Sequence, residues 1–125
     1  MADCPSQPKV VVLVVEDDLI VRMTAAETVC DAGFDVVEAK DADEAILILE
    51  SRRDVRIVFT DIDMPGSMDG LKLAAFVRGR WPPIEIIVTS GNRDVSESEM
   101  PERSVFMPKP YKHARLMGML LRLSR

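Results

Sequence analysis

The sequence predicts one α/β domain in which helices cover both faces of an open parallel sheet. Short apolar runs rich in β-branched residues alternate with longer amphipathic stretches, as expected when strands are buried on both faces. The chain has 125 residues, which is close to the usual size of a single domain. Because crossovers between parallel strands are right-handed, five such units in series favour a doubly wound sheet.

The strands are predicted from the apolar runs. Residues 10–15 are six consecutive aliphatic side chains, and further strands are expected at 34–38, 57–60, 84–89 and 104–107. Residues 1–8 are predicted to form a loose tail, which leaves residues 9–125 as the domain.

The first helix is predicted from apolar spacing. Leu19, Met23, Ala26 and Cys30 recur at intervals of four, three and four residues, and Gly33 follows them. This pattern is typical of an amphipathic helix with a glycine C-cap. Cys30 is interpreted as a small core residue.

The other helices show similar signals. Asp41 and Glu44 have the spacing of a capping box, and the stripe that follows consists of Ala42, Ala45, Ile46 and Leu49. A third helix is expected from Leu71, Ala74, Ala75 and Arg78, ending at Gly79 before Pro82 and Pro83. The last helix has apolar positions at Leu116, Met119, Leu120 and Leu123. Residues 92–103 are polar and contain Pro101, so a short helix or an irregular loop is predicted there.

Composition excludes several classes of protein. Sixteen basic and 21 acidic residues give a net charge of −5, which disfavours DNA binding through the phosphate backbone. No apolar run approaches the roughly 20 residues of a membrane span, and the N-terminus has no basic start typical of a signal peptide. Two cysteines make neither a disulfide framework nor a metal cluster. We therefore expect a cytoplasmic protein that binds neither DNA nor membranes.

Polar residues follow the predicted strands at their carboxyl ends. They are Glu16, Asp17 and Asp18 after the first strand, Asp61 and Asp63 after the third, Thr89 and Ser90 after the fourth, and Lys109 and Pro110 after the fifth. In an open parallel sheet these ends share one edge, where ligands bind. With strand order 2-1-3-4-5 the acids of strands 1 and 3 converge. Clustered carboxylates repel one another without a cation, so the pattern predicts a hard divalent ion, Mg²⁺ or Mn²⁺.

This set of residues resembles the receiver domain of two-component response regulators over residues 9 to 124. The acidic pair Glu16-Asp17, the segment from Asp61 through Met64-Pro65-Gly66 to Asp69-Gly70, Thr89 and Lys109-Pro110 match the family's motifs in order. Each match alone is weak, but together they are specific. The resemblance implies a flavodoxin-like (βα)5 fold with strand order 2-1-3-4-5.

The resemblance also implies a role for each matched residue. Asp61 would accept a phosphoryl group from a sensor histidine kinase or a histidine phosphotransfer protein. Asp17, Glu16 and Asp61, with the backbone carbonyl of Asp63, would bind Mg²⁺. Lys109, preceding a cis peptide bond to Pro110, would pair with Asp61 and then with the phosphoryl oxygens.

Two further residues are assigned to the response to phosphorylation. Thr89 would turn toward the phosphoryl group, with Ser90 as the alternative hydroxyl. Phe106 would follow that movement by changing rotamer, although a plain core residue is the alternative. Asp18 is interpreted as the N-cap of the first helix.

Two departures from the family pattern concern the site. Glu16 stands where an aspartate is frequent, and its extra methylene changes its reach to the metal. The loop from Pro65 to Gly70 is one residue longer than the commoner form.

The expected activity is therefore a phosphorylation switch that is not an enzyme beyond its own phosphorylation and dephosphorylation. The sequence ends directly after the last helix, so we expect a stand-alone receiver that signals to an unidentified downstream protein. A weak homodimer through the face formed by residues 92–103, the fifth strand and the last helix is a further expectation. The alternatives are a pseudo-receiver that only docks or dimerises, and a phosphatase of haloacid-dehalogenase type suggested by Asp61-Ile62-Asp63.

Overall fold

The computed structural model describes residues 10–91 and 94–125, so the predicted tail at residues 1–8 lies outside the described residues. The elements, in chain order, are β1 (Val11–Val15), α1 (Leu19–Asp31), β2 (Asp35–Ala39), α2 (Ala42–Ser51), β3 (Val55–Asp61), α3 (Gly70–Arg80), β4 (Glu85–Ser90), a 3₁₀ turn η1 (Glu97–Glu99), β5 (Ser104–Pro108) and α4 (His113–Leu123).

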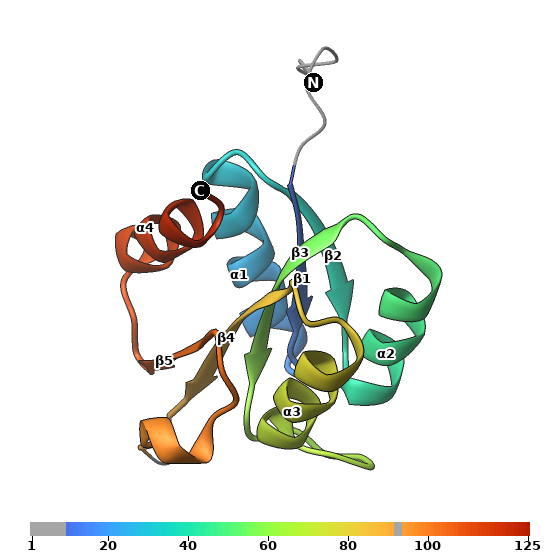
Figure 1. Ribbon diagram of the computed structural model, residues 1–125. Coiled ribbons are helices and arrows are strands. Elements are labelled where there is room, and N and C mark those ends of the chain that lie inside the picture. The colour runs from blue at the N-terminus through green and yellow to red at the C-terminus, as the bar shows by residue number, and fades with distance from the viewer. Residues whose placement is uncertain (1–9, 92–93) are drawn as a thin grey trace.

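The five strands form one parallel sheet in the order β2-β1-β3-β4-β5, which confirms the predicted topology. α1 and α4 lie on one face of the sheet, and α2 and α3 lie on the other (Figure 1). The central strands carry almost only buried side chains: β1 is buried at all five positions, as its unbroken aliphatic run predicted.

Two apolar cores lie on the two faces of the sheet. Under α2 and α3, Leu49, Leu73 and Val77 pack against Leu13 and Val58. On the other face, α1 and α4 pack against β1, β3 and β4, and the buried side chains there include Val12, Val29, Ile57, Leu116 and Leu120. Because alternate residues of a strand point to opposite faces, the same β-strand supplies both cores.

The prediction for the buried face of α1 is correct for Ala26 and wrong for Leu19, Met23 and Cys30. The helix forms where the apolar spacing indicates, but its buried residues are Ala25, Ala26, Thr28 and Val29. Leu19 and Met23 are 55% and 54% exposed, and Cys30 is exposed rather than part of the core. The buried face is thus rotated around the helix toward Ala25 and Val29, which leaves the larger side chains of Leu19 and Met23 facing outward. The helix ends before Gly33, which adopts φ +96°, the left-handed conformation that glycine tolerates.

The fourth crossover, which joins β4 to β5, is the shortest of the four. Its described part contains only the 3₁₀ turn η1, in agreement with the predicted short helix or irregular loop. α3 continues through Gly79 to Arg80, one residue beyond its predicted end. From α3, Arg78 Nε donates to the carbonyl of Glu102 at 2.7 Å and Nη2 to that of Arg103 at 3.0 Å. These bonds anchor the turn that leads into β5.

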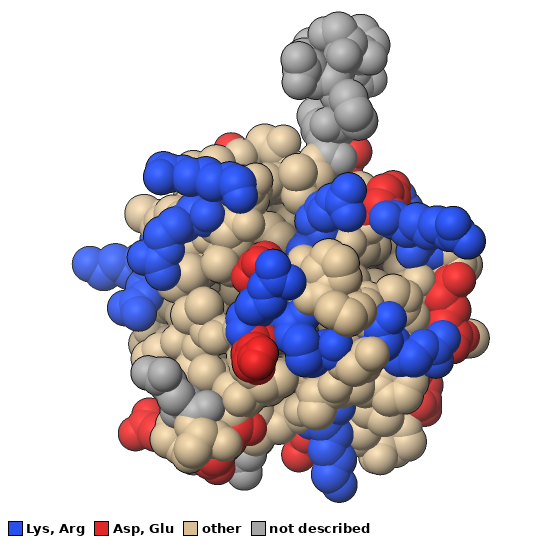
Figure 2. All heavy atoms as spheres, viewed as in Figure 1, with Lys and Arg blue, Asp and Glu red and all other residues tan. Residues whose placement is uncertain are grey.

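The amino-terminal edge of the sheet carries a basic groove of about 500 Å³ whose walls include Arg52, Arg53, Arg56 and Arg80. Figure 2 shows basic side chains gathered over the α2–β3 connection, with a second group over α4. Arg52 pairs with Asp54 at 2.8 Å and Arg80 with Glu50 at 3.4 Å. Positive side chains near helix C-termini interact favourably with the helix dipole. This interaction and the ion pairs give the basic side chains of the groove a structural role. The groove lies at the edge of the sheet opposite the site described next.

Candidate functional site

The carboxyl ends of β1, β3, β4 and β5 meet at one edge of the sheet, the lower edge in Figure 1. Asp61 is the last residue of β3, and its register partner on β4 is Thr89. Ser90 ends β4, while Glu16 and Lys109 directly follow β1 and β5. The structure therefore brings together the polar residues that the sequence places after the strands.

Three carboxylates form a group that fits a divalent cation. Glu16, Asp17 and Asp61 each offer one oxygen, and the three oxygens lie within 4.8 Å of one another. Glu16 and Asp61 are 5% and 6% exposed, while Asp17 is exposed. Carboxylate oxygens at this spacing are the ligands that a hard ion such as Mg²⁺ prefers, with waters completing the octahedron.

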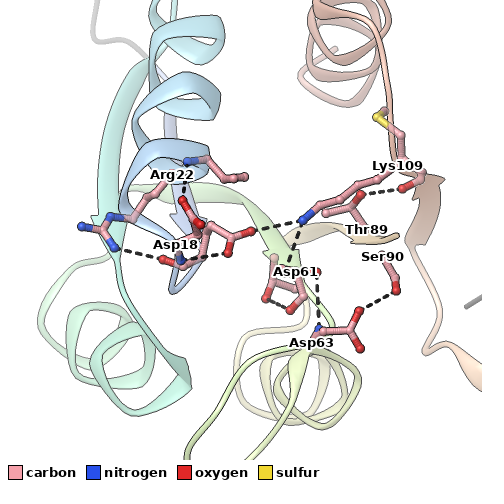
Figure 3. Close-up of polar contacts among 11 residues, drawn as sticks. Asp18, Arg22, Asp61, Asp63, Thr89, Ser90 and Lys109 are labelled. Carbon is pink, nitrogen blue, oxygen red and sulfur yellow. Dashed lines mark hydrogen bonds and ion pairs between the residues drawn. The ribbon is translucent and has the colours of Figure 1, made fainter. Parts of the chain in front are cut away.

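Lys109 bridges two of these acids. Its Nζ lies 3.4 Å from Glu16 Oε1 and 3.4 Å from Asp61 Oδ2 (Figure 3). Burial alone would lower the pKa of Lys109, but the charges of Asp61 and Glu16 outweigh burial and hold this pKa above its usual value. Lys109 is therefore a protonated, half-buried ammonium group beside Asp61. The Lys109–Pro110 peptide bond is cis.

Glu16 has an unusual protonation equilibrium. Burial raises its pKa from 4.5 to about 7; the backbone N–H of Asp18 opposes the rise, and the charge of Asp61 adds to it. Glu16 Oε2 accepts that N–H at 3.0 Å. The ionised carboxylate is thus costly in the folded protein when no cation is bound.

Replacing Glu16 with glutamine is expected to stabilise the metal-free protein at pH 8 by about 1 to 3 kcal/mol. The pKa is raised in the folded state, so ionisation costs nothing below about pH 4.5 and its full amount above about pH 7. Glutamine keeps an acceptor for the Asp18 N–H and removes the charge. Urea unfolding in EDTA at pH 8 and at pH 4.5 measures the gain, which should vanish at the lower pH.

The matched control is Glu27→Gln, because Glu27 is an exposed acid on α1. Its effect should stay within about 0.5 kcal/mol at both pH values. Equal stability of the Glu16→Gln variant and the wild type at pH 8 would contradict the assigned cost.

The two hydroxyls at the end of β4 donate to acceptors other than Asp61. Thr89 Oγ1 donates to the carbonyl of Met107 at 2.6 Å, and Ser90 Oγ donates to Asp63 Oδ2 at 2.7 Å. The backbone N–H of Asp63 donates to Asp61 Oδ1 at 3.3 Å, as Figure 3 shows. Phe106 is half-buried on β5 and packs against the α2–α3 core.

Local structure explains how these residues are held. Asp18 caps α1 by accepting the N–H of Val21 at 3.0 Å, as predicted. Asp69 caps α3 by accepting the N–H of Lys72 at 2.9 Å. The longer loop before α3 turns at Gly66, with φ +110°, and Ser67 Oγ donates to Asp43 of α2 at 2.6 Å.

Arg22 is a site neighbour that the sequence analysis missed. Its Nη1 donates to the backbone carbonyl of Glu16 at 3.0 Å, and its Nε contacts Glu38 of β2 at 3.1 Å. Arg22 thereby ties α1 to the ends of β1 and β2. The one signal in the sequence is its position one helical turn after the cap residue Asp18, which gives no indication of these partners.

The comparisons with known proteins agree with this geometry. The family model described as the response regulator receiver domain matches residues 12–121. The response regulator protein FleR of Pseudomonas aeruginosa is 32% identical over 114 residues, which cover 89% of this chain and 24% of FleR. The sensor kinase CckA of Brucella abortus is 36% identical over 104 residues, 80% of this chain and 11% of that protein.

Solved structures show the same fold. A response regulator receiver protein from Sinorhizobium medicae superposes with a TM-score of 0.85 at 28% identity, covering 92% of this chain and 94% of that one. The receiver domain of NtrX from Brucella abortus gives a TM-score of 0.81 at 31% identity, over 90% of this chain and 96% of that chain.

The chain belongs to the response regulator receiver domain family of two-component signalling. This family is not an enzyme family in the usual sense, and membership in it excludes the haloacid-dehalogenase alternative. The sequence spans about a quarter of the length of FleR. Within the described ranges, no helix is both long and apolar enough to cross a membrane.

Proposed function

We propose that this receiver takes a phosphoryl group onto Asp61 from a phosphohistidine of a sensor histidine kinase or a histidine phosphotransfer protein. The observation that carries the proposal is the position of the buried Asp61 carboxylate, which lies beside the carboxylates of Glu16 and Asp17 and 3.4 Å from the ammonium group of Lys109. A carboxylate is an effective phosphoryl nucleophile, and transfer requires mainly positioning and charge neutralisation.

The transfer exchanges one bond to phosphorus for another. An oxygen of Asp61 forms a bond to phosphorus while the bond between phosphorus and the imidazole nitrogen breaks. The electron pair of the broken bond stays with the imidazole, which takes up a proton, and Asp61 becomes an acyl phosphate. Hydrolysis of that acyl phosphate by water returns free Asp61 and inorganic phosphate.

The residues present fit a magnesium site. The carboxylates of Glu16, Asp17 and Asp61 would hold the ion, with the backbone carbonyl of Asp63 as a further ligand. When bound, the ion neutralises charge on the phosphoryl oxygens. Lys109 would neutralise further charge on those oxygens, since its ammonium group already contacts Asp61.

Phosphorylation would be sensed by Thr89 and Phe106. In the unphosphorylated chain the Thr89 hydroxyl donates to Met107, so we propose that it turns to a phosphoryl oxygen and that Phe106 changes rotamer in response. Such a change shifts an existing equilibrium between two conformations. The face formed by the turn η1, β5 and α4 would pass the signal to a downstream protein or to a second copy in a weak homodimer.

The surface beside the site suits the docking of a protein donor. Leu19, Ile20 and Met23 of α1 are 55%, 70% and 54% exposed. They adjoin a groove of about 330 Å³ lined by Ile20, Val21, Thr24, Lys109, Pro110 and Tyr111. Exposed apolar side chains that cluster in this way mark protein interaction sites.

Incubation with Mg²⁺ and acetyl phosphate, followed by intact mass measurement, tests the proposal. The wild type is expected to gain one phosphoryl group. The gain should disappear without Mg²⁺ and in Asp61→Asn, whereas Asp43→Asn, which changes an exposed acid on α2, should keep it. Absence of the adduct from the wild type, with Asp61→Asn indistinguishable from it, would instead support a pseudo-receiver that only docks or dimerises.

A further inference from the structure

Ser90 occupies a junction between two parts of the site. It is 2% exposed, and its hydroxyl donates to Asp63 Oδ2 at 2.7 Å. Its backbone carbonyl accepts the N–H of Lys109 at 3.0 Å. Figure 3 shows Ser90 on β4 with the Asp63 carboxylate directed toward it. One buried residue therefore contacts both the loop that follows β3 and the lysine that follows β5.

The bond from Ser90 to Asp63 restrains backbone that touches Asp61. Asp63 is exposed, and its N–H donates to Asp61 Oδ1 at 3.3 Å. A hydrogen bond from a buried hydroxyl to a carboxylate is charge-assisted and stronger than a neutral one. This bond links the Asp63 side chain to β4.

We propose that Ser90 is a positioning residue of the metal site, which acts through the Asp63 carboxylate to hold the Asp63 backbone against Asp61. This inference rests on the proposed function, which assigns the Asp63 carbonyl to the metal. A serine hydroxyl has one proton, so Ser90 cannot donate to Asp63 and to a phosphoryl oxygen at the same time. The proposal thus assigns Ser90 a role different from the phosphoryl-binding alternative predicted from its sequence position.

A double-mutant cycle read out by magnesium affinity tests the role of Ser90. Calorimetric titration with MgCl₂, without any phosphodonor, is made on the wild type, Ser90→Ala, Asp63→Ala and the double variant. Ser90→Ala should weaken Mg²⁺ binding about three- to tenfold, the range that one hydrogen bond supports. In the Asp63→Ala background the same substitution should have no further effect on Mg²⁺ affinity, because the carboxylate through which Ser90 is proposed to act is gone.

Ser67→Ala is the matched control. Ser67 lies in the same loop as Asp63. Like Ser90, it donates its hydroxyl to a carboxylate, Asp43 Oδ1 at 2.6 Å. Neither Ser67 nor Asp43 is among the proposed metal ligands. This variant should bind Mg²⁺ as the wild type does. In the metal-free protein, hydrogen exchange at the Asp63 amide should accelerate in Ser90→Ala and stay unchanged in Ser67→Ala.

Each outcome decides the inference. An equal effect of Ser90→Ala in both backgrounds, or no effect in the wild type, would overturn it. If the cycle shows the expected coupling but no phosphoryl adduct forms, only the phosphoacceptor assignment fails. If the wild type binds no Mg²⁺, both the metal assignment and this inference are wrong.

Discussion

Replacing Lys109 with methionine is expected to slow phosphorylation by acetyl phosphate about 10²- to 10³-fold, the usual cost of removing one preorganised charge-stabilising group. Methionine keeps much of the apolar stem and removes the ammonium group that lies 3.4 Å from Asp61 Oδ2. In the proposed transfer, negative charge lies on the equatorial oxygens of the phosphoryl group. The Lys109→Met variant lacks one of the two positive charges that the proposal assigns to neutralise it. Quenching samples at successive times and measuring the phosphorylated fraction by intact mass gives the rate.

Measuring magnesium affinity distinguishes a slow reaction caused by loss of the Lys109 charge from one caused by weaker metal binding. Lys109 contacts both Glu16 and Asp61, so it competes with a cation for those carboxylates. The Lys109→Met variant should therefore bind Mg²⁺ at least as tightly as the wild type while reacting more slowly. Lys112→Met changes an exposed lysine at the start of α4 and should react at the wild-type rate. A Lys109→Met rate within threefold of the wild type would contradict the role of the ammonium group.

Replacing Gly70 with alanine is expected to destabilise the fold by about 3 kcal/mol or more. A Cβ at this position would lie 2.1 Å from the carbonyl oxygen of Asp61 and 2.7 Å from Ile62 Cα. These are backbone atoms, so they cannot rotate away as a flexible side chain would. Relief requires α3 to move from the end of β3, which carries the proposed phosphoacceptor Asp61. Denaturant unfolding measures the loss, and adduct formation should fall with it.

Gly79 provides the control within the same helix. It is exposed, and a Cβ there would meet nothing within 4 Å. Gly79→Ala should therefore stabilise the protein, by up to about 1 kcal/mol, through helix propensity alone. If the Gly70→Ala and Gly79→Ala variants have similar stability, the close approach of α3 to β3 does not require glycine at position 70.

Much of this molecule can be read from its sequence because its signals are local. An unbroken aliphatic run such as residues 10–15 predicts a strand buried on both faces, and parallel topology then places every strand end at one edge. The acids at the ends of β1 and β3 and the lysine after β5 are therefore expected at the same edge of the sheet. The caps Asp18 and Asp69 are equally local, since each bonds an N–H three residues away.

Only the tertiary structure decided which neighbours those residues have. Apolar spacing placed α1 correctly, but the face that packs against the sheet is the one with Ala25 and Val29, so Leu19 and Met23 are exposed. Ser90 and Asp63 are 27 residues apart in the chain, and Arg22 and Glu38 are 16 apart. Hydrogen bonds over such separations depend on strand register and on the positions of loops. Sequence patterns of a few residues carry no information about either, because both are set by how the packed layers fit together.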